Sequence, residues 1–206
     1  MRHRATPTAG HPGDRAEHAL GSRPASPWVR AVAWLVAAWC VGFATVNVVF
    51  EATGHFAEGA HAEYATALSV MDWVVSVLKL LGATVALVSV TSRAVLLPAR
   101  LVAVMLCGAA ALLGLYSLGS VVEAIGIVTG AVGDPDDLDL RSVGYLGLFV
   151  VGTAGYGVLA GSFLRRHEMG RREVLLGALG APVVLAALLV AVPFALVLLG
   201  VMPAYS

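Results

Sequence analysis

The stretch LVAVMLCGAAALLGLYSLGSVVEAIGIV, residues 101–128, decides the fold of this chain. Only one of these residues, Glu123, is charged. An α-helix needs about 20 apolar residues to cross roughly 30 Å of hydrocarbon. The stretch is too long, and too rich in Ala, Leu and Gly, to be a lipid-exposed strand. It therefore predicts a membrane-spanning helix.

Four further stretches of the same kind surround it, at residues 28–50, 66–90, 144–164 and 174–200. Over the 206 residues, 59% are hydrophobic and 13% are charged, whereas soluble domains average about 45–50% apolar and about 25% charged residues. This composition excludes a water-soluble domain. We predict an all-α, polytopic membrane helix bundle with five transmembrane helices. The alternative is four spans, with the last segment re-entrant or interfacial.

The first 27 residues differ from the rest of the chain, because they show no apolar period and contain four prolines, three His and four Arg. Such a segment buries too little apolar surface to offset the entropy lost on ordering. We therefore predict a disordered cytoplasmic tail over residues 1–27 and a single transmembrane helical domain over residues 28–206. The long polar lead favours an uncleaved first span over a cleaved signal peptide.

Arginine is distributed unevenly over the predicted loops. Eleven of the 12 Arg lie before or at the start of the first span, after the second span, or after the fourth. Arg141 is the only Arg or Lys in the two acidic loops, at residues 51–63 and 131–143. The positive-inside rule then places the N-terminus in the cytoplasm and the C-terminus outside. Arg exceeds Lys by 12 to one, a bias typical of GC-rich bacterial genomes, so we expect a multi-pass protein of the bacterial plasma membrane.

Several polar side chains fall inside the predicted spans. A charge at membrane depth costs roughly 2.5–3.5 kcal/mol on insertion scales, so each one requires a reason. Spacings of three and four residues align these side chains on one face of each helix. We predict an interhelical polar cluster, open toward the outer half of the membrane, that comprises Asn47, Glu51, Asp72, Lys79, Tyr116, Ser120 and Glu123. Two interpretations stay open: a network that fixes helix packing, or a cavity for a proton, cation or small polar ligand.

The first outer loop contains the pattern E-x3-H-x2-E-x2-H-x-E, which begins at Glu51. Its candidate metal ligands are His55, Glu58 and His61, since imidazole and carboxylate together suit Zn, Mn, Fe or Ni. The spacing differs from HExxH and other zinc-enzyme patterns. A divalent metal is one hypothesis for this loop, and a solvated acidic loop is the other. No other cofactor is predicted.

The remaining motifs indicate packing. Gly157 and Gly161 form a G-x-x-x-G which, with Gly152 and Gly155, predicts close helix contacts within the chain or between chains. Cys40 and Cys107 fit as small apolar core residues. The formal net charge of zero gives no indication of a nucleic-acid partner.

Residues 73–172 resemble a family of small polytopic membrane proteins of unknown function that is common in actinobacteria. The resemblance rests on VLKLLGATVAL around Lys79, on LLPAR at 96–100, on LLGLYSLGSVVEAIGIVTG at 112–130, on the Asp-rich outer loop and on the Gly-rich fourth helix that ends in RR. It implies the same membrane topology. A second, weaker similarity is to four-helix DoxX-like membrane proteins, through the segment LKLLGA.

We expect a non-enzymatic accessory or small-ligand-binding membrane protein with an outward-facing polar cluster. Its partners are the lipid bilayer and a membrane protein or a second copy of the chain, with no nucleic acid. One alternative is a small proton- or cation-coupled transporter with Lys79, Asp72 and Glu123 as the relay. Another is an outer-leaflet membrane enzyme with a metal or acid–base site near Glu51 and His55.

Overall fold

The computed structural model describes residues 24–55, 65–91, 97–132 and 140–200, and over these residues the chain is helical with no strand. The helices are α2 (Pro27–Ala52), α3 (Ala65–Val88), α4 (Ala99–Val128), α5 (Leu140–Arg166) and α6 (Arg171–Leu198). Each helix begins and ends within four residues of the boundaries predicted from the sequence. The prediction of five helices is confirmed. The four-span alternative required the last segment to be re-entrant or interfacial, but α6 is one continuous helix of 28 residues.

All five helices are long and apolar enough to cross a membrane. The protein is therefore an all-α, multi-pass integral membrane protein. Most of the predicted tail and of the two acidic outer loops lies outside the described residues.

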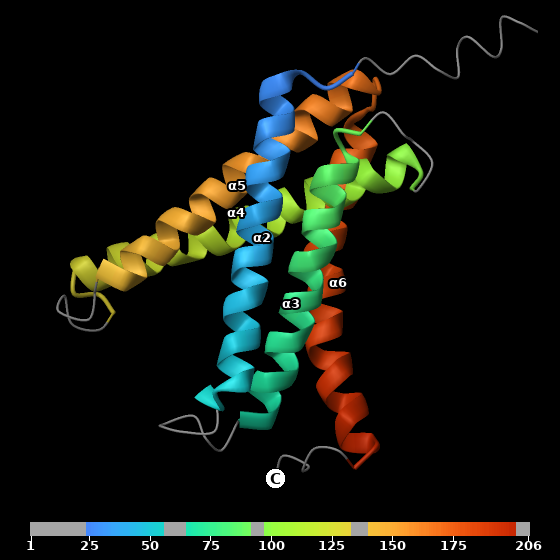
Figure 1. Ribbon diagram of the computed structural model, residues 1–206. Helices are drawn as coiled ribbons and strands as arrows, with labels where there is room; N and C mark the ends of the chain where they lie inside the picture. Colours follow the sequence, from blue (N-terminus) through green and yellow to red (C-terminus); the bar gives the residue numbers. More distant parts are fainter. Residues whose placement is uncertain (1–23, 56–64, 92–96, 133–139, 201–206) are drawn as a thin grey trace, which may run out of the picture.

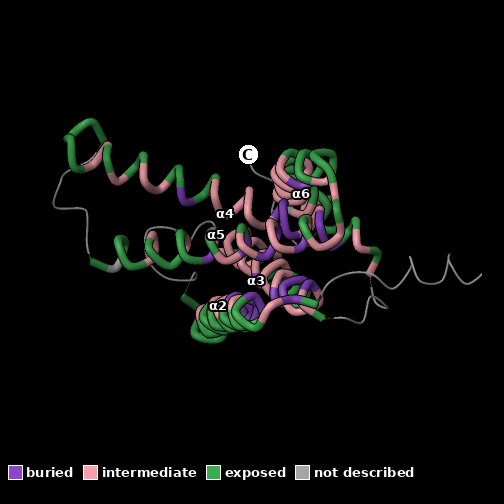
Figure 2. The backbone as a smooth tube through the Cα atoms, turned by 90° about the horizontal axis from the view of Figure 1, so that it is seen from above, coloured by how far each residue is buried: buried purple, intermediate pink, exposed green. Residues whose placement is uncertain are grey.

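The helices form two groups that cross at a steep angle. Figure 1 shows α2, α3 and α6 with roughly parallel axes, α3 running opposite to the other two, while α4 and α5 form an antiparallel pair that lies across them. In the view from above, α4 lies beside α6 and α5 lies beside α2 (Figure 2), in agreement with the packing of α4 on α5 and α6 and of α2 on α3 and α5. The second half of α4 and the first half of α5 extend beyond the other helices.

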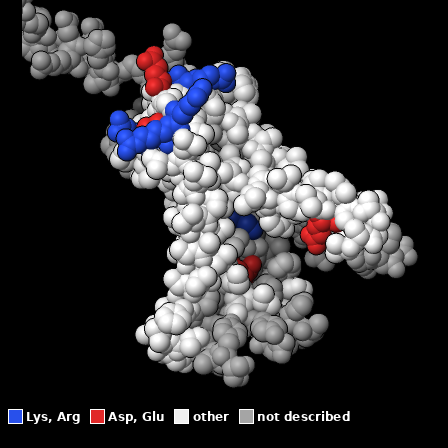
Figure 3. Space-filling model, turned by 180° about the vertical axis from the view of Figure 1, so that it is seen from behind, with Lys and Arg blue, Asp and Glu red and all other residues white. Residues whose placement is uncertain are grey.

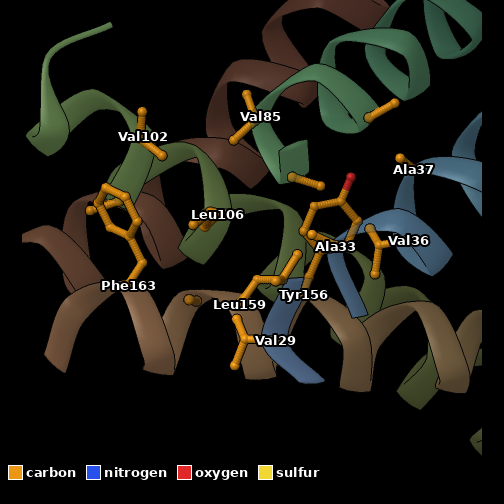
Figure 4. Close-up of a cluster of buried hydrophobic side chains, with 14 of the residues drawn as sticks. Val29, Ala33, Val36, Ala37, Val85, Val102, Leu106, Tyr156, Leu159 and Phe163 are labelled. Carbon is orange, nitrogen blue, oxygen red and sulfur yellow. The ribbon is translucent and has the colours of Figure 1, made fainter. Parts of the chain in front are cut away.

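The core lies where the two groups cross. Tyr156 of α5 is 2% exposed and is the largest fully buried side chain of the described residues. Its ring lies beside Ala33 and Val36 of α2, and its hydroxyl points away from α5 (Figure 4). The core is extended by Leu106 of α4 and by neighbouring small and apolar side chains. Side chains from α2, α3, α4 and α5 pack against one another in this single core.

Glycine allows two pairs of helices to approach closely. A Cβ atom added to Gly177 of α6 would lie 2.5 Å from the carbonyl oxygen of Val104 and 2.9 Å from the backbone nitrogen of Gly108. Gly152 of α5 lies against the indole of Trp39. In contrast, nothing lies within 4 Å of a Cβ at Gly157 or at Gly161. The G-x-x-x-G motif therefore makes no helix contact within the described part of this chain.

Most of the arginines of the described chain gather at one end of the molecule, where α2, α4 and α6 begin and α3 and α5 end (Figures 1 and 3). Arg166 connects the end of α5 to the end of α3, because its Nη2 donates a hydrogen bond of 2.8 Å to the carbonyl oxygen of Ser89 just beyond α3. This carbonyl follows a helix C-terminus, where the last backbone acceptors lack partners within the helix. Apart from Arg141 at the start of α5, the arginines of the described chain thus lie at one end of the molecule.

We predict that Gly177→Ala destabilises the protein by about 1–3 kcal/mol, because the added methyl group meets rigid backbone of α4 instead of a flexible side chain. The measurement is the midpoint of thermal or denaturant unfolding in detergent. Gly180→Ala in the same helix is the control, since a Cβ there has nothing within 4 Å. It should leave stability unchanged or raise it by up to about 1 kcal/mol. Equal effects of the two substitutions would contradict the close crossing of α4 and α6.

Candidate functional site

A cleft of about 530 Å³ lies where α4 and α5 diverge from α2 and α3. Its walls come from residues 43–50 of α2, from Lys79 of α3, from residues 116–127 of α4 and from residues 142–149 of α5. Figure 3 shows a hollow near the middle of the molecule, with a basic group inside it and acidic atoms nearby. The cleft lies in the half of the molecule away from the arginine-rich end.

Lys79 is the only cation among the residues that line this cleft. Its Nζ lies 4.7 Å from the centre of the Phe43 ring, a distance at which a cation is attracted to the face of an aromatic ring. Among the described residues, no carboxylate oxygen lies within 4.0 Å of Lys79 Nζ, so Lys79 forms no ion pair there. Its side chain also makes no hydrogen bond to these residues. Asp72, two helical turns away, interacts with it only electrostatically.

Aromatic rings form one wall of the cleft. Phe43 of α2 lies 5.3 Å from Phe149 of α5, and Phe149 lies 4.4 Å from Tyr116 of α4, measured between ring centres. Trp39 packs behind them, 4.8 Å from Phe43. Aromatic pairs at 4.5–7 Å each contribute about 0.5–1.5 kcal/mol beyond the area they bury. The three helices are therefore joined beside Lys79 by a rigid aromatic surface.

The structure brings five of the seven predicted cluster residues to this one cleft: Asn47, Lys79, Tyr116, Ser120 and Glu123. Asn47 is only 8% exposed, and its amide has no hydrogen-bond partner among the residues that the structure describes. Glu123 is exposed and lies on the projecting half of α4, so it does not neutralise Lys79.

Glu51 and Asp72 do not line the cleft. Ser69 Oγ donates a hydrogen bond of 2.6 Å to Glu51 Oε2, which joins α3 to α2. Asp72 interacts electrostatically with Glu51 and with Lys79. One oxygen of each carboxylate, Glu51 Oε1 and Asp72 Oδ2, is shielded from solvent without a hydrogen-bond partner. The predicted single cluster is therefore two neighbouring sites, a cleft around Lys79 and a carboxylate pair.

The predicted metal ligands cannot be assembled from the described chain. His55 stacks on Phe50 at 4.6 Å between ring centres, while Glu58 and His61 lie outside the described residues. Among the residues that are described, no three His, Cys, Asp or Glu side chains are grouped so that they could hold a metal ion.

Two features of the site were not anticipated from the sequence. The first is the aromatic wall, although Trp39 and Phe43, and likewise Tyr145 and Phe149, are four residues apart and so share a helix face. The second is a buried contact of 3.2 Å between the Cys40 thiol and the Tyr156 hydroxyl. Its partners are 116 residues apart, and no local spacing indicates such a contact.

No known protein family matches this chain, and neither a curated protein nor a solved structure shows significant similarity to it.

We predict that Gly82→Ala destabilises the protein by about 1–3 kcal/mol, because the new Cβ would overlap the Tyr156 hydroxyl oxygen. Tyr156→Phe removes that oxygen together with its hydrogen bond to Cys40, at a cost of about 0.5–1.5 kcal/mol. In the Tyr156→Phe background, Gly82→Ala should therefore cost less than it does in the wild-type chain. The measurement is a double-mutant cycle of unfolding free energies, and strictly additive costs would contradict the contact.

Proposed function

We propose that this protein binds a small ligand in the cleft between the α2–α3 pair and the α4–α5 pair, as a non-enzymatic membrane protein. The observation that carries the proposal is Lys79, which has no ion pair among the described residues and faces a cleft of about 530 Å³ that Asn47 also lines. Ligand pockets of about 300–1,000 Å³, mostly apolar with a few polar groups, are typical of small-molecule sites.

A purely structural role for Lys79 is the competing interpretation. A buried charge retained for packing is expected to be paired and hydrogen-bonded. Lys79 instead has an aromatic ring as its nearest described partner. The lack of an ion pair in the described chain therefore favours a ligand as the missing partner.

The depth of Lys79 supports the same view. Trp73 of α3 is 50% exposed, and exposed tryptophans are enriched at the membrane–water interface. Lys79 lies six residues further along α3, about 9 Å at 1.5 Å per residue, which places it within the hydrocarbon layer. Asp72 lies beside Trp73 and therefore at the interface, where a charge costs less.

We propose that the arginine-rich end faces the cytoplasm of a bacterial cell and that the cleft opens into the outer half of the plasma membrane. The common end of the described arginines other than Arg141 supports this orientation, because positive loops are retained on the cytoplasmic side.

Proton- or cation-coupled transport is a second candidate. A series of ionisable groups leads from Lys79 to Asp72 and on to Glu51, since Asp72 interacts electrostatically with both. The partnerless carboxylate oxygens of this pair could accept a proton or a cation. Glu123 does not belong to this series, because it lies on the projecting half of α4.

Orientation is tested with reporters fused to the two ends of the chain. We expect a C-terminal alkaline phosphatase, which folds only outside the cytoplasm, to be active and an N-terminal fusion to be inactive. A fluorescent protein that matures only in the cytoplasm should give the opposite result. Activity of alkaline phosphatase at the N-terminus would overturn the orientation.

Access to the cleft is tested by cysteine substitution on α4. We predict that Ser120→Cys, which lines the cleft, reacts with a charged, membrane-impermeant thiol reagent. Leu118→Cys is the matched control on the same helix. Leu118 is 61% exposed on the bundle surface but would face lipid, where a charged reagent does not enter. The native thiols of Cys40 and Cys107 are buried and should not react.

A result in which both substituted thiols are unreactive would mean that the cleft is closed to polar ligands, and the proposal would fail. A result in which both react equally would place the cleft side of α4 and its opposite surface in the same aqueous environment. That outcome would contradict the proposed membrane position.

A further inference from the structure

The charges that line the cleft have opposite signs at its two ends. Lys79 lies beside Phe43 at the wall where α2 meets α3. Glu123 lies on α4 two helical turns beyond Tyr116, about 10 Å further along at 1.5 Å per residue. An acid group placed in the cleft would be attracted to the first position and repelled from the second. The electrostatics of the lining therefore fix which end of the cleft an anion would occupy.

The polar groups nearest this end can donate hydrogen bonds to an anion. The ammonium group of Lys79 has three N–H donors and no acceptor. The side-chain amide of Asn47, four residues from Phe43 on α2, adds two N–H donors and makes no hydrogen bond to the described residues. No side-chain atom of Asn47 is among the fully buried polar atoms that lack a partner, so the amide is accessible from the cleft that Asn47 lines. An oxygen-rich anion would supply the acceptors that both side chains lack.

The rest of the wall suits an apolar body. Phe43, Phe149 and Tyr116 form a continuous aromatic surface beside Lys79, and Val46, Leu146 and Ile127 continue the lining in the same apolar character. A compact inorganic anion would leave this surface exposed. A cleft of about 530 Å³ lies in the size range that buries one small molecule, and a two-chain phospholipid would extend beyond it.

We infer that the ligand of this cleft is an organic anion, an acid group on a compact apolar body, with the acid at Lys79 and Asn47 and the body against the aromatic wall of Phe43, Phe149 and Tyr116. This inference rests on the proposed ligand-binding function and names its substrate class. The source of the anion is either a free carboxylate or the headgroup of an anionic lipid that enters the cleft from its open side.

The test uses the full chain in phosphatidylcholine nanodiscs, with octanoate as the probe and empty nanodiscs as the blank. Octanol and octylammonium have the same tail with a neutral or a positive head. We expect octanoate to bind in calorimetry and to slow the labelling of Ser120→Cys, while octanol and octylammonium do neither. Equal protection by all three would overturn the inference of an anion and would leave the ligand-binding cleft intact.

The role of Lys79 is tested with Lys79→Met, which keeps the length of the side chain and removes its charge. We expect octanoate affinity to fall about 10- to 100-fold, the range that a hydrogen bond to a charged group supplies. Lys79→Arg should stay within a few-fold of wild type. Arg165→Met is the control for loss of a positive charge elsewhere, because Arg165 is exposed at the arginine-rich end, and it should leave octanoate binding unchanged.

Unchanged octanoate affinity in Lys79→Met would overturn the inference. If Lys79→Met does not fold, the comparison of octanoate with octylammonium on the wild-type chain decides the sign of the ligand. The source is assigned by replacing phosphatidylcholine with phosphatidylglycerol. Loss of octanoate binding in those discs would identify an anionic lipid headgroup at Lys79, and retained binding would identify a free anion. Failure of every amphiphile to bind, together with an unreactive Ser120→Cys, would instead overturn the proposed function itself.

Discussion

The burial of Tyr156 is the contact on which the arrangement of the helices depends. Its hydroxyl meets the Cys40 thiol of α2 at 3.2 Å, and it occupies the space that a side chain at Gly82 of α3 would fill. One side chain of α5 thus packs against both α2 and α3. Because α5 and α4 pack along their length, this contact also fixes where α4 crosses the other helices. Beyond the crossing the two pairs separate, and the cleft occupies the space between them.

Small residues set how closely the helices meet at this crossing. Lipid tails are as apolar as Leu, so helix association in a membrane depends on close packing and on polar contacts more than on the hydrophobic effect. Gly177 brings α6 onto the backbone of α4, and Gly152 brings α5 onto Trp39 of α2. The outer surface of α6 is meanwhile formed by large apolar side chains such as Leu179, Val183 and Val190. These side chains face the lipid of the surrounding bilayer in a membrane-spanning helix.

The polar groups of the membrane region fall into two environments. Glu51, Ser69 and Asp72 lie together between α2 and α3 near the ends of these helices. Lys79 lies two helical turns further along α3 and faces the cleft, beside a ring instead of a carboxylate. A charge within a membrane-spanning helix is costly, and Lys79, which has no ion pair among the described residues, lies at the wall of a cavity large enough for a small molecule. For this reason we assign the ligand-binding role to the cleft around Lys79 and a structural role to the contacts of Tyr156.

The sequence by itself determined the five helices and their order. These features depend on local composition, because about 20 consecutive apolar residues must form a helix in lipid. It also identified Asn47, Lys79, Tyr116, Ser120 and Glu123 as neighbours, since helical spacing and antiparallel order place them at similar depths. Only the tertiary structure separated Glu51 and Asp72 from that cleft, built its aromatic wall and paired Cys40 with Tyr156. The physical reason is that the crossing angle and rotation of each helix are set by packing between residues far apart in the chain, such as Gly82 against Tyr156, which the pattern of any single helix does not contain.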